Sequence, residues 1–217
     1  MALERKIPPR FITIVELVFA FFMTASLYSV IEHLDITVFQ NLLKFGLCTL
    51  ILIRFFFAPT SNIECMLVYT RKSNWRRWSI LFWDFPALIM HAAFFYFICT
   101  FFWKYAYLNN REPFLYFLSL LIFNSLWLST ISYRLWKWEK IEKRRIYRFY
   151  VWIWNNLSFS ILISLFINSK LSLLMFFGYL NCIIDILLTA PDYLEQRVQN
   201  KPVIKFLRFK FWPRSRL

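Results

Sequence analysis

Glycine is almost absent from this sequence, because Gly46 and Gly178 are the only two in 217 residues. The glycine-rich loops that bind phosphates or dinucleotides are therefore excluded. Histidine is equally scarce, with two residues, and the four cysteines have no paired spacing. These counts exclude the usual zinc, haem and thiol-redox motifs, so we expect no metal and no cofactor. The chain also lacks a serine-nucleophile elbow and a paired-histidine motif, and we do not expect an enzyme.

Acidic residues are few, and apolar residues are in excess. The chain has 12 Asp and Glu against 26 Lys and Arg, a formal net charge of +14, and it is 59% hydrophobic and 22% aromatic. Soluble domains are about 45–50% apolar. A chain that is both very apolar and very basic is typical of a membrane protein. We therefore predict an all-α integral membrane protein with no soluble domain.

Six apolar runs are long enough to span a bilayer, which takes about 20 residues of helix. We predict a basic tail over residues 1–10, a transmembrane domain over 11–190 and a basic amphipathic tail over 191–217. The predicted spans are 11–31, 39–58, 78–103, 114–133, 149–167 and 171–190. The first run is longer than the apolar region of a signal peptide, so we interpret it as a retained signal anchor.

Prolines agree with most of these boundaries. We expect Pro59 and Pro191 to end the second and sixth helices, because proline cannot continue a helix without losing a hydrogen bond. Pro86 is the one proline that falls inside a predicted span. There it would free the carbonyl of Phe82, one turn earlier, beside Asp84.

Basic residues predict the orientation. With six spans, 21 of the 26 Lys and Arg lie in the tails and loops of one side. The positive-inside rule then places both termini in the cytoplasm and the protein in the cytoplasmic (inner) membrane. Since this rule already accounts for the charge, we do not expect a nucleic-acid partner. Candidate contacts with a partner protein or with anionic lipids of the inner leaflet are Lys140, Lys143, Arg144, Arg145, Lys205, Arg208 and Lys210.

Ionisable residues inside spans are costly and are functional candidates by default. Here Glu16, Arg54, Asp84 and Asp185 all fall roughly 6–9 Å below the predicted cytoplasmic interface, at about 1.5 Å per helical residue. Helical spacing adds polar neighbours on the same faces, as small and polar stripes do when they turn toward other helices. The resulting candidate ion or proton site consists of Asp84, Asp185, Asn181, Asn156 and His91.

A purely structural interpretation competes with this one. Glu16 would form an intramembrane ion pair with Arg54 across the first helical hairpin, and Asp84 and Asp185 would accept hydrogen bonds from asparagines and hold the bundle together. The sequence alone leaves the two interpretations open.

The first functional hypothesis is a small polytopic channel- or transporter-like protein, in oligomeric form, with an acidic polar seam near the cytoplasmic end of the bundle. The alternative is a non-catalytic accessory or anchor subunit of a membrane complex or of a defence or stress system, which docks a partner on its basic cytoplasmic face. A third hypothesis, an intramembrane lipid-processing enzyme built on Asp84, His91 and Asp185, is the weakest, because no nucleophile arrangement accompanies these residues.

Overall fold

The computed structural model describes residues 9–32, 38–69, 80–104, 111–137 and 143–198, and every regular element in these ranges is a helix. The elements are α1 (Pro9–Glu32), α2 (Phe39–Tyr69), the π-helix η1 (Ile80–Asp84), α4 (Phe85–Lys104), α5 (Glu112–Lys137), α6 (Lys143–Leu165) and α7 (Leu171–Val198).

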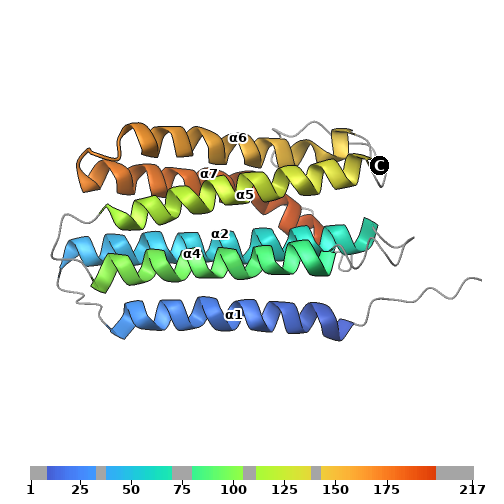
Figure 1. Ribbon diagram of the computed structural model, residues 1–217, viewed down its shortest axis with the longest axis horizontal. Helices are drawn as coiled ribbons and strands as arrows, with labels where there is room; N and C mark the ends of the chain where they lie inside the picture. The colour runs from blue at the N-terminus through green and yellow to red at the C-terminus, as the bar shows by residue number, and fades with distance from the viewer. Residues whose placement is uncertain (1–8, 33–37, 70–79, 105–110, 138–142, 199–217) are drawn as a thin grey trace, which may run out of the picture.

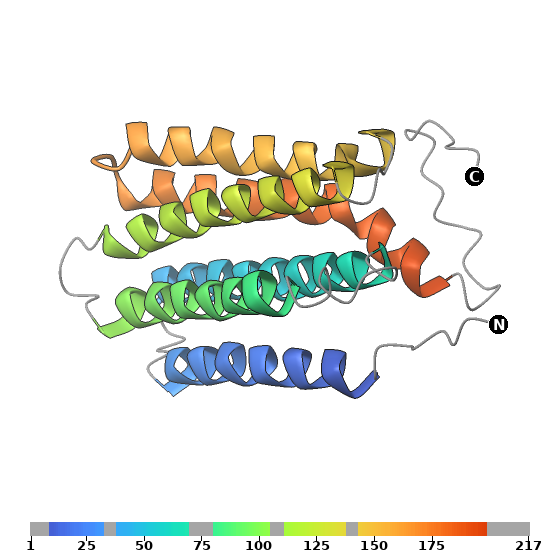
Figure 2. The ribbon, with the colours of Figure 1, turned by 45° about the vertical axis from the view of Figure 1, so that its right-hand side comes forward.

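Successive α-helices run in opposite directions, side by side along one axis (Figures 1 and 2). As a result, α1 starts at the same end of the bundle at which α2, α5 and α7 finish. We call this the Arg134 end, after a residue in the last turn of α5. The opposite end, where α2, α5 and α7 start, is called the Arg111 end, after the residue that precedes α5.

Three helical segments in the described part of the chain are long and apolar enough to cross a membrane: Phe82–Trp103, Glu112–Lys137 and Leu171–Leu188. The outside of the bundle is apolar too, and Phe82 and Trp83 are each 71% exposed. Such a surface suits hydrocarbon rather than water. These features support a membrane-embedded protein, whereas the number of spans and their orientation stay predictions.

Prolines do not end the helices as expected. Pro59 lies inside α2, which continues to Tyr69, and Pro191 lies inside α7, which continues to Val198. The expectation that these prolines terminate their helices is therefore wrong. Each removes a single helical hydrogen bond, and long helices supported by their neighbours tolerate that loss.

Pro86 lies inside the apolar helical segment Phe82–Trp103, as predicted. The expected third span is divided into η1, which ends at Asp84, and α4, which begins at Phe85. Pro86 therefore directly follows a π-helical turn within a continuous helical segment, and the helix goes on past it to Lys104. The wider π turn carries Asp84 as its last residue, and π turns are often found at functional sites.

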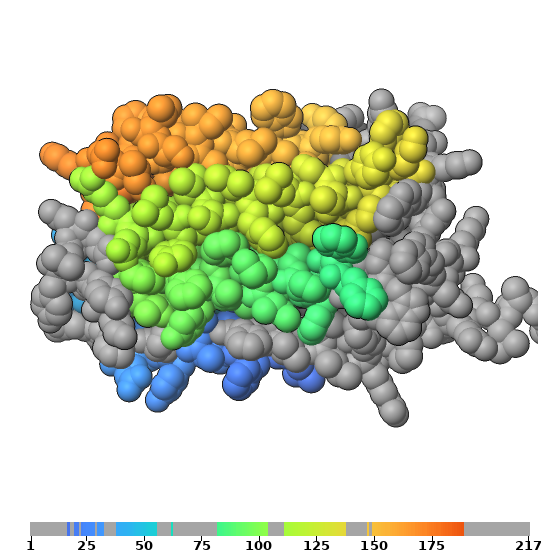
Figure 3. Space-filling model, viewed as in Figure 1, coloured from blue at the N-terminus to red at the C-terminus, as the bar shows by residue number. Residues whose placement is uncertain are grey.

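All six described α-helices contribute buried side chains to one apolar core. α5 packs between α4 and α6, α1 packs on α4, and α2 packs on α7. The side chains of α4, α5 and α6 meet along the face shown in Figure 3. Aromatic rings join α4 to α5, since Tyr116 stacks on both Phe97 and Phe101 at a centroid distance of 5.0 Å.

Both glycines lie where α2 and α7 approach closely. A Cβ on Gly46 would overlap the hydroxyl of Tyr179, and one on Gly178 would lie 3.1 Å from the methyl groups of Leu47. The Tyr179 hydroxyl donates a hydrogen bond to the Leu43 carbonyl oxygen at 2.6 Å. The absence of a side chain at Gly46 therefore leaves room for this contact between the helices.

We expect Gly46→Ala to lower the free energy of unfolding by about 1 kcal/mol, because the Tyr179 hydroxyl must move and give up its bond to Leu43. The double variant with Tyr179→Phe should be no less stable than Tyr179→Phe alone. Unfolding in detergent measures all three proteins. If Gly46→Ala lowered the free energy of unfolding equally in wild type and in Tyr179→Phe, this explanation of the close approach would be incorrect.

Candidate functional site

Arg54 on α2 is the centre of a buried polar cluster. Its Nε lies 2.9 Å from Asp185 Oδ2, and its Nη2 lies 3.3 Å from Asp185 Oδ1. The same guanidinium donates hydrogen bonds to the side-chain oxygens of Asn181 and Asn156. Arg54 and Asp185 are each only 3% exposed, and both asparagines are completely buried. We call these four residues the Arg54 cluster.

The Arg54 cluster connects α2 to two helices that are distant from it in sequence, α6 and α7. Arg54 comes from α2, Asn156 from α6, and Asp185 with Asn181 from α7. The planar guanidinium suits this task because its five N–H groups form a rigid fork that matches carboxylate and amide oxygens. Asn155 Nδ2 lies 3.5 Å from Asp185 Oδ1 and supplies a further, weaker contact.

Two amide groups in the Arg54 cluster are left with unused donors. The Nδ2 atoms of Asn156 and Asn181 are buried and have no hydrogen-bond partner. Turning either amide over would point N–H groups at the Arg54 guanidinium, which has only donors. Buried donors of this kind are rare in proteins and call for an acceptor. The two Nδ2 groups are therefore the donors that the contacts within the cluster leave without a partner.

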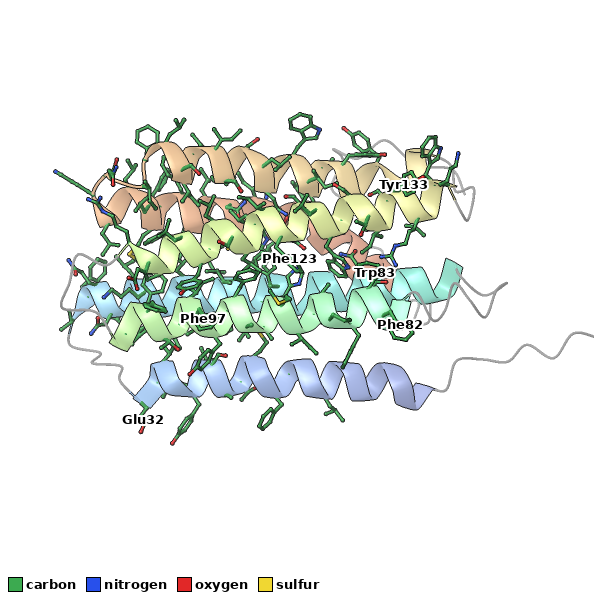
Figure 4. All side chains as sticks on the ribbon, viewed as in Figure 1. Glu32, Phe82, Trp83, Phe97, Phe123 and Tyr133 are labelled. Atoms are coloured by element: carbon green, nitrogen blue, oxygen red, sulfur yellow. The ribbon has the colours of Figure 1, made fainter. Side chains whose placement is uncertain are left out.

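Asp84 lies in a second buried cluster. Arg134 Nη1 donates to Asp84 Oδ2 at 3.0 Å, and Nη2 of the same residue contacts Asp84 Oδ1. The indole Nε1 of Trp127 donates to Asp84 Oδ1 at 2.8 Å. Asp84 is fully buried and Arg134 is 6% exposed. We call these three residues the Asp84 cluster; Trp83 and Tyr133, labelled in Figure 4, are the neighbours of Asp84 and Arg134 in the chain.

His91 is not a member of either ion pair. Its Nδ1 lies 2.6 Å from the Ala87 carbonyl oxygen, and its Nε2 lies 3.0 Å from Asn124 Oδ1. Because a carbonyl can only accept, Nδ1 is the donor in the first contact. Nε2 is then the acceptor of a neutral ring, so it bonds to Asn124 when that amide presents its Nδ2 group here, and both ring nitrogens have partners within the helices.

Aromatic rings connect the two clusters through His91. The Arg54 guanidinium carbon lies 4.6 Å from the ring centroid of Phe55, and that ring is 5.8 Å from His91. His91 is in turn 5.2 Å from the ring of Trp127, which donates to Asp84. The two clusters are therefore joined by packed aromatic rings, and the described contacts of these rings form no continuous chain of hydrogen bonds.

Serine hydroxyls near the clusters are satisfied within their own helices. Ser125 and Ser132 of α5 donate to the carbonyls of Leu121 and Leu128, and Ser160 of α6 donates to that of Asn156. They add no further polar contact between helices. The inter-helix polar contacts of this region therefore come mainly from the two arginines and their partners.

The structure brings together only part of the predicted site. Asp185, Asn181 and Asn156 meet around Arg54, whereas Asp84 bonds to Arg134 and His91 bonds to Asn124. Glu16 lies on α1, but its side chain is outside the described residues, so the predicted pair with Arg54 stays a prediction. The same holds for the side chains of the predicted partner or lipid contacts: Lys140, Lys143, Arg144, Arg145, Lys205, Arg208 and Lys210.

Sequence analysis missed Arg134 and Trp127. Arg134 was assigned to a cytoplasmic loop, but it lies in the last turn of α5 and is buried against Asp84. The spacing offered a signal, because Trp127 and Arg134 are seven residues apart and so share one helical face. That signal was obscured because a basic residue at the end of a span is also what the positive-inside rule predicts.

Comparisons with the profiles of known protein families, with curated proteins and with solved structures found no match for this chain. The features that bear on function are therefore the Arg54 cluster, the Asp84 cluster and the apolar helices.

Proposed function

We propose that this chain is a multi-pass membrane protein of the channel or transporter class, in which the Arg54 cluster is the site that responds to a proton. One observation carries the proposal: a buried arginine–carboxylate pair from different helices lies beside two amide donors that have no partner. Intramembrane ionisable groups mark ion or proton pathways in many membrane proteins. The protein is proposed to be non-enzymatic and to work as an oligomer in the inner membrane, with both termini in the cytoplasm.

A proton suits this site better than a metal cation. Asp185 and Asp84 each already face an arginine, so each pair has no net charge to offer a cation. No group of three or more His, Cys, Asp or Glu side chains that could hold a metal ion occurs among the described residues. A proton needs only one carboxylate oxygen, and its arrival would neutralise Asp185.

Protonation of Asp185 would release Arg54. The buried guanidinium would then lack its counterion, which is costly in a low-dielectric interior. The nearby asparagine oxygens accept hydrogen bonds from Arg54 but carry no negative charge. We therefore expect α2 to shift relative to α7 on protonation, and loss of the proton to restore the pair.

Proton flux through the purified protein in sealed liposomes tests this function. Wild type should conduct protons. Proton flux through Asp185→Asn should be at least about tenfold lower, because the amide cannot bind and release a proton. Glu112→Gln is the matched control, since Glu112 is exposed in the first turn of α5, away from both clusters, and its loss should leave flux unchanged.

Equal flux in wild type and Asp185→Asn would disprove the assigned site. No flux through folded wild-type protein would disprove the transport function. The accessory or anchor function would then be favoured. The accessory function is supported by two basic helix ends at the Arg134 end of the bundle, because Lys137 ends α5 and Lys143 begins α6 there.

A further inference from the structure

A cavity of about 690 Å³ lies at the Arg111 end of the bundle, opposite the end where Arg134 lies. It is formed where α2 and α7 begin and where the chain enters α5. Its volume is within the range of about 300–1,000 Å³ that is usual for binding sites of small ligands. Neither of the two buried clusters contributes a residue to it.

The rim of this cavity is positively charged. Arg111 and Lys170 line it and are exposed, and none of the lining residues carries a carboxylate. Arg111 is held in place by Asn168, since Nη1 donates to Asn168 Oδ1 at 2.5 Å and Nη2 donates to the Asn168 carbonyl oxygen at 3.0 Å. The guanidinium is therefore positioned at the cavity before any ligand arrives.

Helix ends add to the positive potential. α2, α5 and α7 all begin at the Arg111 end, and the N-terminus of a helix carries about half a positive charge. In α7 the N–H groups of Leu173 and Leu174 bond to the Lys170 carbonyl at 3.0 and 3.4 Å. The N–H groups of the first residues of a helix have no such partner and favour anions.

One wall of the cavity is apolar and continues into the membrane-facing surface. Met175, Phe176 and Tyr179 lie along α7, and Phe176 is 56% exposed. They belong to the segment Leu171–Leu188, which is apolar enough to cross a membrane. A ligand that fills the whole site would combine an anionic head with an apolar tail.

We infer that this cavity binds one anionic phospholipid. The phosphate lies between Arg111 and Lys170, and one acyl chain runs along Met175 and Phe176. Charge complementarity selects the headgroup, and the apolar wall distinguishes a lipid from a free anion. The site is separate from the proposed proton site and does not depend on it.

Native mass spectrometry of the detergent-purified protein with added phosphatidylglycerol tests the site. Wild type should retain one lipid, and the double variant Arg111→Gln/Lys170→Gln should retain it at least about tenfold less. Lys137→Gln is the control, because it removes an exposed positive charge in the last turn of α5, at the opposite end of the bundle, and it should retain the lipid as wild type does. Phosphatidylcholine, which has no net charge, should be retained less than phosphatidylglycerol.

Two further arms separate a lipid from a simple anion. Phe176→Ala should weaken phosphatidylglycerol retention several-fold, since Phe176 is exposed and its loss leaves the core intact. Millimolar inorganic phosphate should not displace the lipid. The inference is overturned if Arg111→Gln/Lys170→Gln retains the lipid like wild type, or if phosphate displaces it while Phe176→Ala has no effect.

Discussion

Replacement of Arg54 by methionine is expected to destabilise the protein by about 3–5 kcal/mol, among the largest effects of any single change. The variant leaves the Asp185 carboxylate buried without its counterion, and it leaves the side-chain oxygens of Asn156 and Asn181 without their donor. Equilibrium unfolding in detergent would measure the loss directly. A loss below about 1 kcal/mol, the usual contribution of an exposed pair, would contradict the buried ion pair.

Removal of both members of the ion pair gives the decisive comparison with Arg54→Met. Arg54→Met/Asp185→Leu removes both charges, and we expect it to be substantially more stable than Arg54→Met alone, because no uncompensated charge is left. Arg111→Met is the matched control, because it removes an arginine that is exposed at the end of the bundle. It should lower the free energy of unfolding much less than Arg54→Met does. If the double variant were no more stable than the single one, Asp185 would not be the counterion.

A comparable loss is expected when Asp84 is replaced by leucine. The change takes away the only carboxylate in contact with Arg134 among its described partners, and it removes the acceptor of the Trp127 indole N–H. A buried arginine without an anion and a buried donor without an acceptor together should cost about 3–5 kcal/mol. The variant should also alter the environment of Trp127, which tryptophan fluorescence can detect.

Stability of Asp84→Leu/Arg134→Met tests whether the charge explains that loss. Without either charge, only the Trp127 donor is left without a partner, so most of the loss should be recovered. Glu112→Leu provides a control at the other end of α5, where the acidic side chain is exposed in the first turn of the helix. An equal loss in Asp84→Leu and Asp84→Leu/Arg134→Met would point to packing rather than charge.

Periodicity and the cost of buried charge were sufficient to predict that Asp84 and Asp185 lie inside the bundle. Asp84 and Asp185 were selected because charged residues are rare inside apolar runs, and both are buried in the structure. Their partners could not be predicted in the same way. Helical spacing shows which face of a helix is polar, but not which helix packs against that face.

The arrangement of the helices determines the partners. Arg54 meets Asp185 because α2 packs on α7, a contact between segments that are far apart in sequence. A prediction based on adjacent helices in a hairpin favours Glu16 instead. Helix ends were equally difficult to predict. Pro59 and Pro191 predicted the ends of their helices, whereas α2 and α7 continue past them in the structure.

The sequence separation of the two ion pairs has a consequence for biosynthesis. Asp84 and Arg134 are 50 residues apart, so their pair can form as soon as α5 has been made. Arg54 and Asp185 are 131 residues apart. At a synthesis rate of about 5–20 residues per second, Arg54 is without its counterion for roughly 7–26 s. Completion of α7 is therefore the step that supplies Arg54 with its counterion.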